Sequence, residues 1–357
     1  MSVELKSVSA IILAAVCGFG IPKCIAQSAP ESTASVACPQ RVSEFERQRN
    51  TAVRLLKAGK AADALQALSS AYMLCPVDYQ NAYDLAVAEV HTGENDKARS
   101  LIVELLQNQN RADLHTLLGR LYSSEKNHRA AAAQFQQAAE LVQSEPNIFD
   151  FGTSLFKIDW GAAEKILRFG IEKYPTSVRL HVALGTALYG QSMPDEGAAI
   201  LCKAAEIDGS DPHPMEILAD TEVIPLTLLP KVVSLFASLR GRYPNDGTLL
   251  FDYTMARSGR WSGSKDVVPP GFVEAISNAL LLNPRLPQAY YVLGLVNAEE
   301  EQYNSAITLF KKAIELKPDK DEYHYRLAFA YRKVGDESAA KEEIQLFREL
   351  HSRNSAP

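Results

Sequence analysis

Apolar residues recur along most of the chain at the spacing of one face of an α-helix. From about residue 45 onward they follow an i, i+3, i+4, i+7 pattern in pairs of short runs, with a turn between the two runs of each pair. The clearest pair spans Pro287 to Lys320, and similar pairs recur about every 34 residues. We count nine repeats, which begin near residues 45, 79, 112, 145, 178, 212, 247, 287 and 321. A period of this length predicts a stacked array of helical hairpins, and therefore an all-α solenoid.

Two positions of the repeat carry side chains of opposite size. The eighth position is Gly or Ala in eight of the nine repeats: Ala52, Ala86, Gly119, Gly152, Gly185, Ala219, Thr254, Gly294 and Ala328. Near the twenty-fourth position, and later in the repeat with extra residues, a large apolar residue occurs in all of them: Leu68, Ile102, Phe135, Leu167, Leu201, Phe236, Ile276, Phe310 and Ile344. Because Gly inside a helix costs about 0.5–1 kcal/mol relative to Ala, four mid-helix glycines need a packing reason. We expect the small residue to let two helix backbones approach closely, with the bulky side chain filling the space beside them.

Proline marks the expected end of the second helix in five repeats, because it cannot continue a helix. These prolines are Pro76, Pro175, Pro244, Pro284 and Pro318. The repeats near 212 and 247 fit the pattern less well. The first has an apolar turn bounded by proline at 225–230, and the second has about six extra residues around 260–265.

The period, the small eighth position, Ala near position twenty and Pro near position thirty-two together resemble the tetratricopeptide repeat family. The resemblance covers roughly residues 45–354, although the Trp that the family usually has at position four is absent. It implies a right-handed superhelix whose concave groove is lined by the first helix of each repeat. Such grooves usually bind peptides or other proteins, so the expected partner is a polypeptide.

The resemblance also implies which side chains face the groove, because the second, fifth, sixth and ninth positions tend to do so in this family. Large apolar groups at positions five and nine are the candidate groove residues: Tyr83, Phe149, Phe251, Met255, Tyr291, Leu295, Tyr325 and Phe329. They could anchor an apolar segment of a partner. Alternatively, the rings could pack against the adjacent repeat. The family's basic clamp for a terminal carboxylate is not favoured, because the matching sites include Val53, Asp84 and Asp113.

The first 26 residues have the features of a secretory signal peptide. Lys6 precedes an apolar run from Val8 to Ile21, and Ala26 offers a small residue at the cleavage site. The run, of about 14 residues, is shorter than the roughly 20 that span a bilayer, which disfavours a membrane anchor. A lipoprotein is disfavoured because neither Cys17 nor Cys24 follows a small residue. We therefore expect an exported protein, periplasmic or secreted.

The rest of the chain divides into a flexible linker at 27–40, the array at 41–354 and a frayed tail at 355–357. No later segment is apolar and long enough to span a membrane. In the last helix Phe347 and Leu350 are expected to be partly exposed, which offers a surface for self-association.

Export permits disulfides, and three cysteines follow the leader. Cys38 precedes the first helix and Cys75 ends the second helix of the same hairpin, so the two sulfurs are expected to meet. The alternative is two unrelated thiols. Cys202 has no expected partner within the chain. It is either a buried apolar residue or forms an intermolecular link.

Composition and motifs disfavour several function classes. The chain has 357 residues, 46% of them hydrophobic, and a net charge of −6, which argues against nucleic-acid binding. The seven His residues are scattered, so neither a metal site nor a cofactor is expected, and no motif typical of catalysis stands out.

The preferred hypothesis is an exported, non-enzymatic scaffold that binds a protein in its groove. The alternative is an envelope enzyme or accessory subunit with its site on the inserted loop 258–271. Trp261 in this loop is a candidate second binding residue, unless its ring folds back on its own hairpin.

Overall fold

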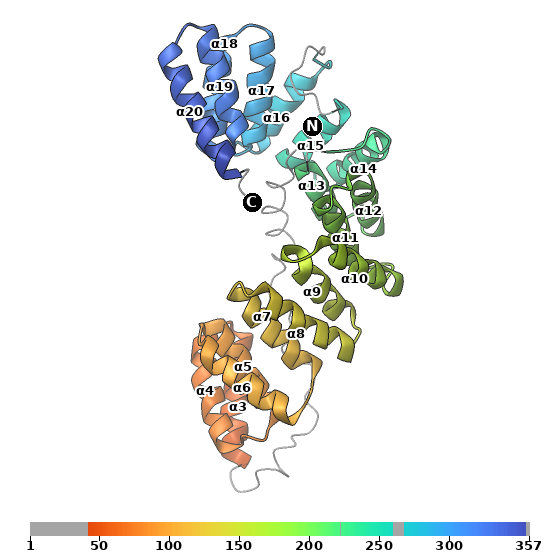
Figure 1. The fold of residues 1–357 in the computed structure, drawn as a ribbon, viewed down its shortest axis with the longest axis vertical. Helices are drawn as coiled ribbons and strands as arrows, with labels where there is room; N and C mark the ends of the chain where they lie inside the picture. The colour runs from red at the N-terminus through yellow and green to blue at the C-terminus, as the bar shows by residue number, and fades with distance from the viewer. Residues whose placement is uncertain (1–41, 222, 260–267, 355–357) are drawn as a thin grey trace. The chain divides into compact units, whose positions relative to one another are not determined.

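The computed structural model describes residues 42–221, 223–259 and 268–354, and these ranges are all-α (Figure 1). They contain eighteen α-helices and one short 3-10 helix, Leu155–Lys157, and successive α-helices pair as antiparallel hairpins. The prediction of an array of about nine helical hairpins is confirmed. The expected signal peptide and linker, at 1–26 and 27–40, and the tail at 355–357 lie outside the described residues.

The chain divides between Pro175 and Thr176 into two compact halves. Four repeats make up the N-terminal half: α3 (Val42–Lys57) with α4 (Ala61–Leu74), α5 (Tyr79–Thr92) with α6 (Asn95–Asn108), α7 (Ala112–Ser124) with α8 (His128–Leu141), and α9 (Glu145–Ser154) with α10 (Trp160–Lys173). Five make up the C-terminal half: α11 (Val178–Gly190) with α12 (Pro194–Ile207), α13 (His213–Asp220) with α14 (Leu229–Arg242), α15 (Gly247–Arg257) with α16 (Phe272–Leu282), α17 (Pro287–Glu299) with α18 (Tyr303–Leu316), and α19 (Asp321–Lys333) with α20 (Glu337–Asn354).

Helix ends follow the local sequence signals. Each of the five predicted prolines lies two residues beyond the last residue of a second helix, α4, α10, α14, α16 or α18. Several first helices begin with a side-chain cap. Asp78 accepts a hydrogen bond from the Asn81 amide at the start of α5, and Asp246 accepts two at the start of α15.

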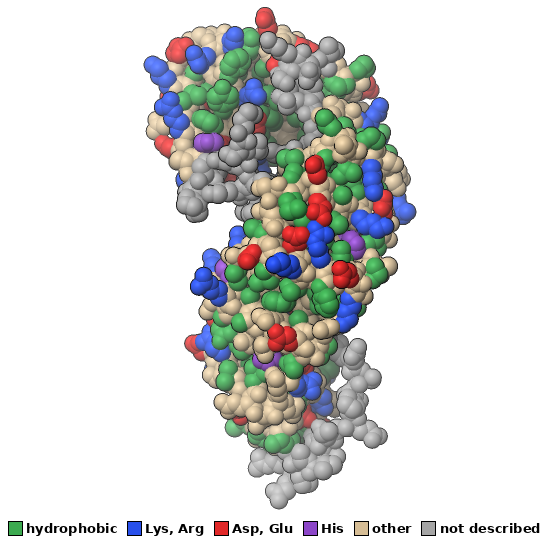
Figure 2. All heavy atoms as spheres, turned by 45° about the vertical axis from the view of Figure 1, so that its right-hand side comes forward, with side chains coloured by type: hydrophobic (Ala, Val, Ile, Leu, Met, Phe, Trp, Pro, Cys, Tyr) green, Lys and Arg blue, Asp and Glu red, His purple; other side chains and the backbone are tan. Residues whose placement is uncertain are grey.

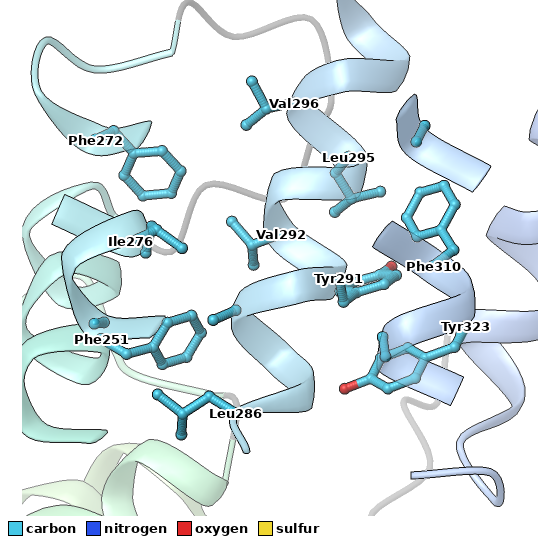
Figure 3. Close-up of a cluster of buried hydrophobic side chains, with 14 of the residues drawn as sticks. Phe251, Phe272, Ile276, Leu286, Tyr291, Val292, Leu295, Val296, Phe310 and Tyr323 are labelled. Carbon is cyan, nitrogen blue, oxygen red and sulfur yellow. The ribbon is translucent and has the colours of Figure 1, made fainter. Parts of the chain in front are cut away.

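Each half contains a hydrophobic cluster that is shared by three successive hairpins. In the C-terminal half, Phe251 and Ile276 of repeat seven, Val292 and Phe310 of repeat eight and Tyr323 of repeat nine belong to one buried cluster (Figure 3). In the N-terminal half an equivalent cluster extends from Ala52 to Leu121. Each hairpin therefore buries its apolar faces against its neighbours.

The four glycines at the eighth position lie directly against the bulky residue of their own hairpin. A Cβ atom on Gly294 would lie 2.6 Å from a ring carbon of Phe310, closer than real Cβ contacts allow. The corresponding distances are 2.8 Å for Gly119 and Phe135, 2.7 Å for Gly152 and Leu167, and 2.8 Å for Gly185 and Leu201. The predicted close approach of the two helices is thus confirmed.

Tyrosines at the ends of second helices tie successive repeats together. The Tyr174 hydroxyl, just after α10, donates to the Gln143 carbonyl of the preceding repeat at 2.8 Å. The Tyr243 hydroxyl, just after α14, makes the equivalent bond to the Ser210 carbonyl at 2.7 Å. Both tyrosines precede a helix-ending proline, so one short motif ends the helix and connects it to the previous hairpin.

The tight glycine contact gives a test of how the array is held together. We expect Gly294→Ala to lower stability by about 1–3 kcal/mol, because the added methyl group must displace Phe310. Gly241→Ala is the matched control, since a Cβ there meets nothing within 4 Å in α14. It should be neutral or stabilising by up to about 1 kcal/mol. Urea unfolding followed by circular dichroism measures both, and equal effects would contradict the packing argument.

Candidate functional site

The eight candidate groove residues lie on the first helices of five repeats, and the structure separates them by exposure. Four are buried: Phe149 and Phe251 are each 7% exposed, Tyr291 is 9% and Leu295 is 5%. Two are half-buried, Tyr83 and Met255. Two reach solvent, Tyr325 at 46% and Phe329 at 43%. The four buried side chains pack inside the array, as in the alternative given for the groove residues.

Tyr291 illustrates the buried group. Its ring packs against Tyr323 of the next repeat, with centroids 4.7 Å apart, and against Phe310 at 5.9 Å (Figure 3). Its hydroxyl donates to Glu322 at the start of α19. Burial, followed by the nearby Glu322 charge, raises the pKa of Tyr291. The side chain therefore joins repeats eight and nine and presents little surface to a partner.

The exposed pair lies on successive turns of α19 and forms part of a larger aromatic surface. Tyr325 contacts Phe347 of α20 at 5.4 Å between centroids, and Phe329 contacts Tyr303 of α18 at 6.5 Å. We call these four residues the aromatic strip. The Lys333 ammonium, one turn further along α19, lies 5.4 Å from the Phe329 ring centre and 5.9 Å from that of Tyr303. The strip is therefore apolar with one positively charged end.

Of the four residues in the aromatic strip, the sequence analysis named Tyr325 and Phe329 as candidate groove residues. Tyr303 and Phe347 belong to second helices, and they join the strip because of how the hairpins pack. Leu350, expected to be partly exposed, is buried at 7%, because it lies on the inner face of α20. Phe347 is half-buried, in agreement with the expected partial exposure.

The N-terminal half presents mainly polar groups at the equivalent places. Tyr83 packs beside Tyr79 with centroids 6.1 Å apart. The Tyr79 hydroxyl donates to Asp113 at 2.8 Å, and Arg111 donates to the same carboxylate while stacking 4.1 Å from the Tyr79 ring centre. Although burial opposes ionisation, these hydrogen bonds hold the pKa of Asp113 below its usual value. The network links repeats two and three.

Asp84, at position six of the second repeat, has an unusual charge state. Burial raises the pKa of Asp84 to about 6, although the hydrogen bond from Gln80 and the charge of Arg49 both oppose the shift. Asp84 is therefore only partly ionised near pH 6.

Three histidines occupy the fourth position of separate repeats, and their ring nitrogens lie close to polar groups of the chain. Both ring nitrogens of His115 lie 2.7 Å from amide oxygens, of Gln134 and Asn110. His181 Nδ1 lies 2.8 Å from the Ser177 carbonyl. His324 Nδ1 lies 2.7 Å from Glu343, which raises the pKa of His324. Among the described residues no group of His, Cys, Asp and Glu has the arrangement of a metal site.

The cysteines and the inserted loop are partly within the described ranges. Cys75 is disulfide-bonded, while its predicted partner Cys38 lies outside the described residues, so the pairing stays a prediction. Cys202 is a free thiol, and burial raises its pKa to about 11. Trp261 also lies outside the described residues.

Positive and negative side chains are interspersed with apolar ones on the face in Figure 2, without a basic patch of the kind that binds nucleic acid. Of the helices in the described ranges, none combines the length and apolarity that crossing a membrane requires.

Comparisons with known proteins agree with the repeat architecture. Family models described as tetratricopeptide or TPR repeats match residues 55–121, 112–142 and 298–335. No curated protein matches the chain.

Solved structures are similar in fold. The C-terminal part of a TPR repeat-containing protein from Cytophaga hutchinsonii is 16% identical with a TM-score of 0.53, over 67% of this chain and 97% of that one. A tetratricopeptide repeat protein from Parabacteroides merdae is 13% identical with a TM-score of 0.43, over 80% and 98%. A thermophilic TPR protein from Thermus thermophilus is 21% identical with a TM-score of 0.40, over 50% and 97%. Of these three, the Cytophaga hutchinsonii structure has a TM-score above 0.5, and at 16% identity it bears on the fold alone.

His324 predicts a pH dependence of stability. Its pKa is raised by folding, so protonated His324 contributes stability that is fully present below about pH 6.5 and is lost as pH rises through the folded-state pKa. We expect His324→Gln to lose most stability at low pH and least above pH 8. Glu343→Gln removes the carboxylate that raises this pKa and should give the same pH-dependent loss. Urea midpoints at pH 5.5 and 8.5 test this, and a loss for His324→Gln that does not vary with pH would refute it.

Proposed function

We propose that the chain is a tetratricopeptide repeat protein that captures a partner polypeptide on the aromatic strip of its last two repeats. Arrays of this family are generally non-catalytic scaffolds for protein–protein interaction. Tyr325 and Phe329 would act as the anchors, with Tyr303 and Phe347 beside them.

One observation carries this proposal: residues at the same repeat positions are buried in repeat eight and exposed in repeat nine. Tyr291 and Leu295 are 9% and 5% exposed, whereas Tyr325 and Phe329 are 46% and 43% exposed. Tyr291 is covered by Tyr323 of the next hairpin, and Tyr325 has the ring of Phe347 on one side. Exposed aromatic groups that lie together are the usual anchors of a protein interface.

The chemistry of the strip suggests the kind of partner segment that fits it. Two rings one helical turn apart suit apolar or aromatic side chains on the partner. Lys333 at the end of the strip forms no ion pair with a described carboxylate, and so favours an acidic group next to those apolar residues. The proposed partner is thus an apolar segment that carries an acidic residue.

Photocrosslinking tests the location directly. With a benzophenone amino acid at position 329, irradiation in extract of the producing cell should yield a discrete adduct, because the ring lies against the bound partner. The matched control places the same group at Leu281 of α16, which is 81% exposed and distant in sequence from the strip. An adduct at both positions, or at neither, contradicts the proposal. An adduct twice the mass of the chain would assign the strip to self-association.

Substitution measures the contribution of the strip to binding. Tyr325→Ala with Phe329→Ala should weaken capture of the crosslinked partner at least about tenfold, since interface aromatics contribute 2 kcal/mol or more. Helicity and the urea midpoint should change little, because both rings are already exposed. Leu281→Ala is the control and should bind as the unmodified chain does.

We infer further that the protein is exported, with the leader cleaved after Ala26 and a bond between Cys38 and Cys75. Support comes from the charged and apolar pattern of residues 1–26 and from the disulfide-bonded state of Cys75. Such a bond would tie the linker to the first repeat.

Mass spectrometry tests export and the bond in one experiment. Expressed with its leader in an exporting bacterium, the protein should begin at Gln27 and give a non-reduced peptide that joins Cys38 to Cys75. Cys75→Ser should remove that peptide and destabilise the first repeat by about 2–4 kcal/mol. Cys202→Ser is the control that keeps it. A chain that retains Met1, or free thiols at both sites, would reject the respective inference.

A further inference from the structure

Repeat seven contains a pocket that the regular repeats do not explain. It has a volume of about 190 Å³ and lies between α14, α15 and the start of α16. Leu250, Phe272, Ala275, Pro269 and Pro270 give it an apolar lining. It lies wholly within the C-terminal half and is separate from the aromatic strip.

The pocket coincides with the exception in the packing pattern. Thr254 lines it, and Thr254 is the residue at the eighth position that is neither Gly nor Ala. Its hydroxyl donates to the Leu250 carbonyl at 2.7 Å, within its own helix. The larger eighth residue and the short helices α15 and α16 are consistent with a less tightly closed hairpin than repeat eight, where Gly294 touches Phe310.

Two arginines at the pocket share one aromatic ring. The guanidinium carbon of Arg240 lies 5.4 Å from the ring centre of Tyr253, and that of Arg257 lies 5.5 Å from the same centre. All three residues line the pocket. Stacking on a ring leaves the N–H edges of a guanidinium free to bind an anion.

Neither arginine is neutralised by the described part of the chain. Arg99, Arg111, Arg120 and Arg168 each form an ion pair with a carboxylate, but Arg240 and Arg257 form none with the described carboxylates. The Asn278 amide, also in the lining, adds a hydrogen-bonding group. The pocket thus combines an apolar interior with two positive charges.

We propose that this pocket binds a small organic acid, with its carboxylate between Arg240 and Arg257 and its apolar body against Leu250 and Phe272. A guanidinium group binds a carboxylate with geometric specificity, through two parallel hydrogen bonds. The apolar lining disfavours strongly hydrated anions such as phosphate. The volume lies below the roughly 300–1,000 Å³ of sites for drug-sized ligands, so the body is about one ring in size.

The probe for this proposal is 3-phenylpropanoate, added to the full-length protein and followed by ligand-observed NMR and calorimetry. We expect a Kd on the order of 0.2–5 mM, as befits a ligand of about eleven heavy atoms. The neutral amide 3-phenylpropanamide, acetate and inorganic phosphate should each bind at least about tenfold more weakly. Binding of 3-phenylpropanoate should also weaken with added salt.

Variants locate the site. Arg240→Gln and Arg257→Gln should each weaken binding of 3-phenylpropanoate at least about tenfold. Arg242→Gln is the matched control, since Arg242 is an exposed arginine of the same helix outside the pocket lining, and it should bind as the unmodified protein does. Circular dichroism checks that all three remain folded.

Several outcomes would overturn the proposal. These are no binding of 3-phenylpropanoate at 10 mM, equal binding of its amide or of phosphate, or equal losses in all three variants. A peptide ending in phenylalanine that binds much more tightly than 3-phenylpropanoate would also overturn it, by assigning the site to a chain terminus. None of these results bears on capture at the aromatic strip, which Tyr325 and Phe329 test independently.

Discussion

The close approach of two helices inside each hairpin is the constraint on which the array depends. Where the eighth residue is Gly, as in Gly119 and Gly294, the bulky side chain of the second helix lies where a Cβ atom would be. The hairpin can then act as a compact unit with apolar faces on both sides, and each face is buried by the next hairpin. The local cost of a helical glycine is offset by packing that a larger residue would prevent. Repeat five has a second close approach of this kind, since a Cβ atom on Gly197 would lie 2.7 Å from a ring carbon of Tyr189.

Once every hairpin has the same shape, the role of a side chain depends on its neighbour more than on its own identity. Tyr291 and Tyr325 occupy the same repeat position, yet one is a buried link to Glu322 and the other is exposed beside Phe347. The same rule explains the polar equivalents in the N-terminal half, where Tyr79 and Asp113 join repeats two and three through a hydrogen bond. A repeat array can therefore change its surface chemistry along its length without changing its fold.

Sequence reasoning predicted whatever depends on period and local chemistry. The spacing of apolar residues predicted the hairpins, and proline predicted the helix ends. The small and bulky positions predicted the close contact between the two helices of a hairpin. It could not separate Phe251 and Tyr291, which are buried, from Tyr325 and Phe329, which are exposed, because exposure is set by the next hairpin. It also missed Tyr303, as well as the set of Arg240, Tyr253 and Arg257. Tyr303 meets Phe329, and Arg240 meets Tyr253, from different helices, and this proximity follows from how the helices pack in space.

The two proposed sites arise from two departures from the regular pattern, and this explains why they differ in chemistry. In repeat nine the hairpin is regular, but α19 keeps Tyr325 and Phe329 exposed, which leaves a broad aromatic surface suited to a polypeptide. In repeat seven it is the hairpin itself that departs, with Thr254 at the small position, and the result is a confined pocket suited to a small molecule. The two proposed sites also differ in where their positively charged side chains lie. Lys333 lies at the edge of the aromatic strip, whereas Arg240 and Arg257 are exposed side chains that line the pocket beside its apolar groups. Regular packing thus supplies the scaffold, and its local exceptions supply the candidate sites for binding.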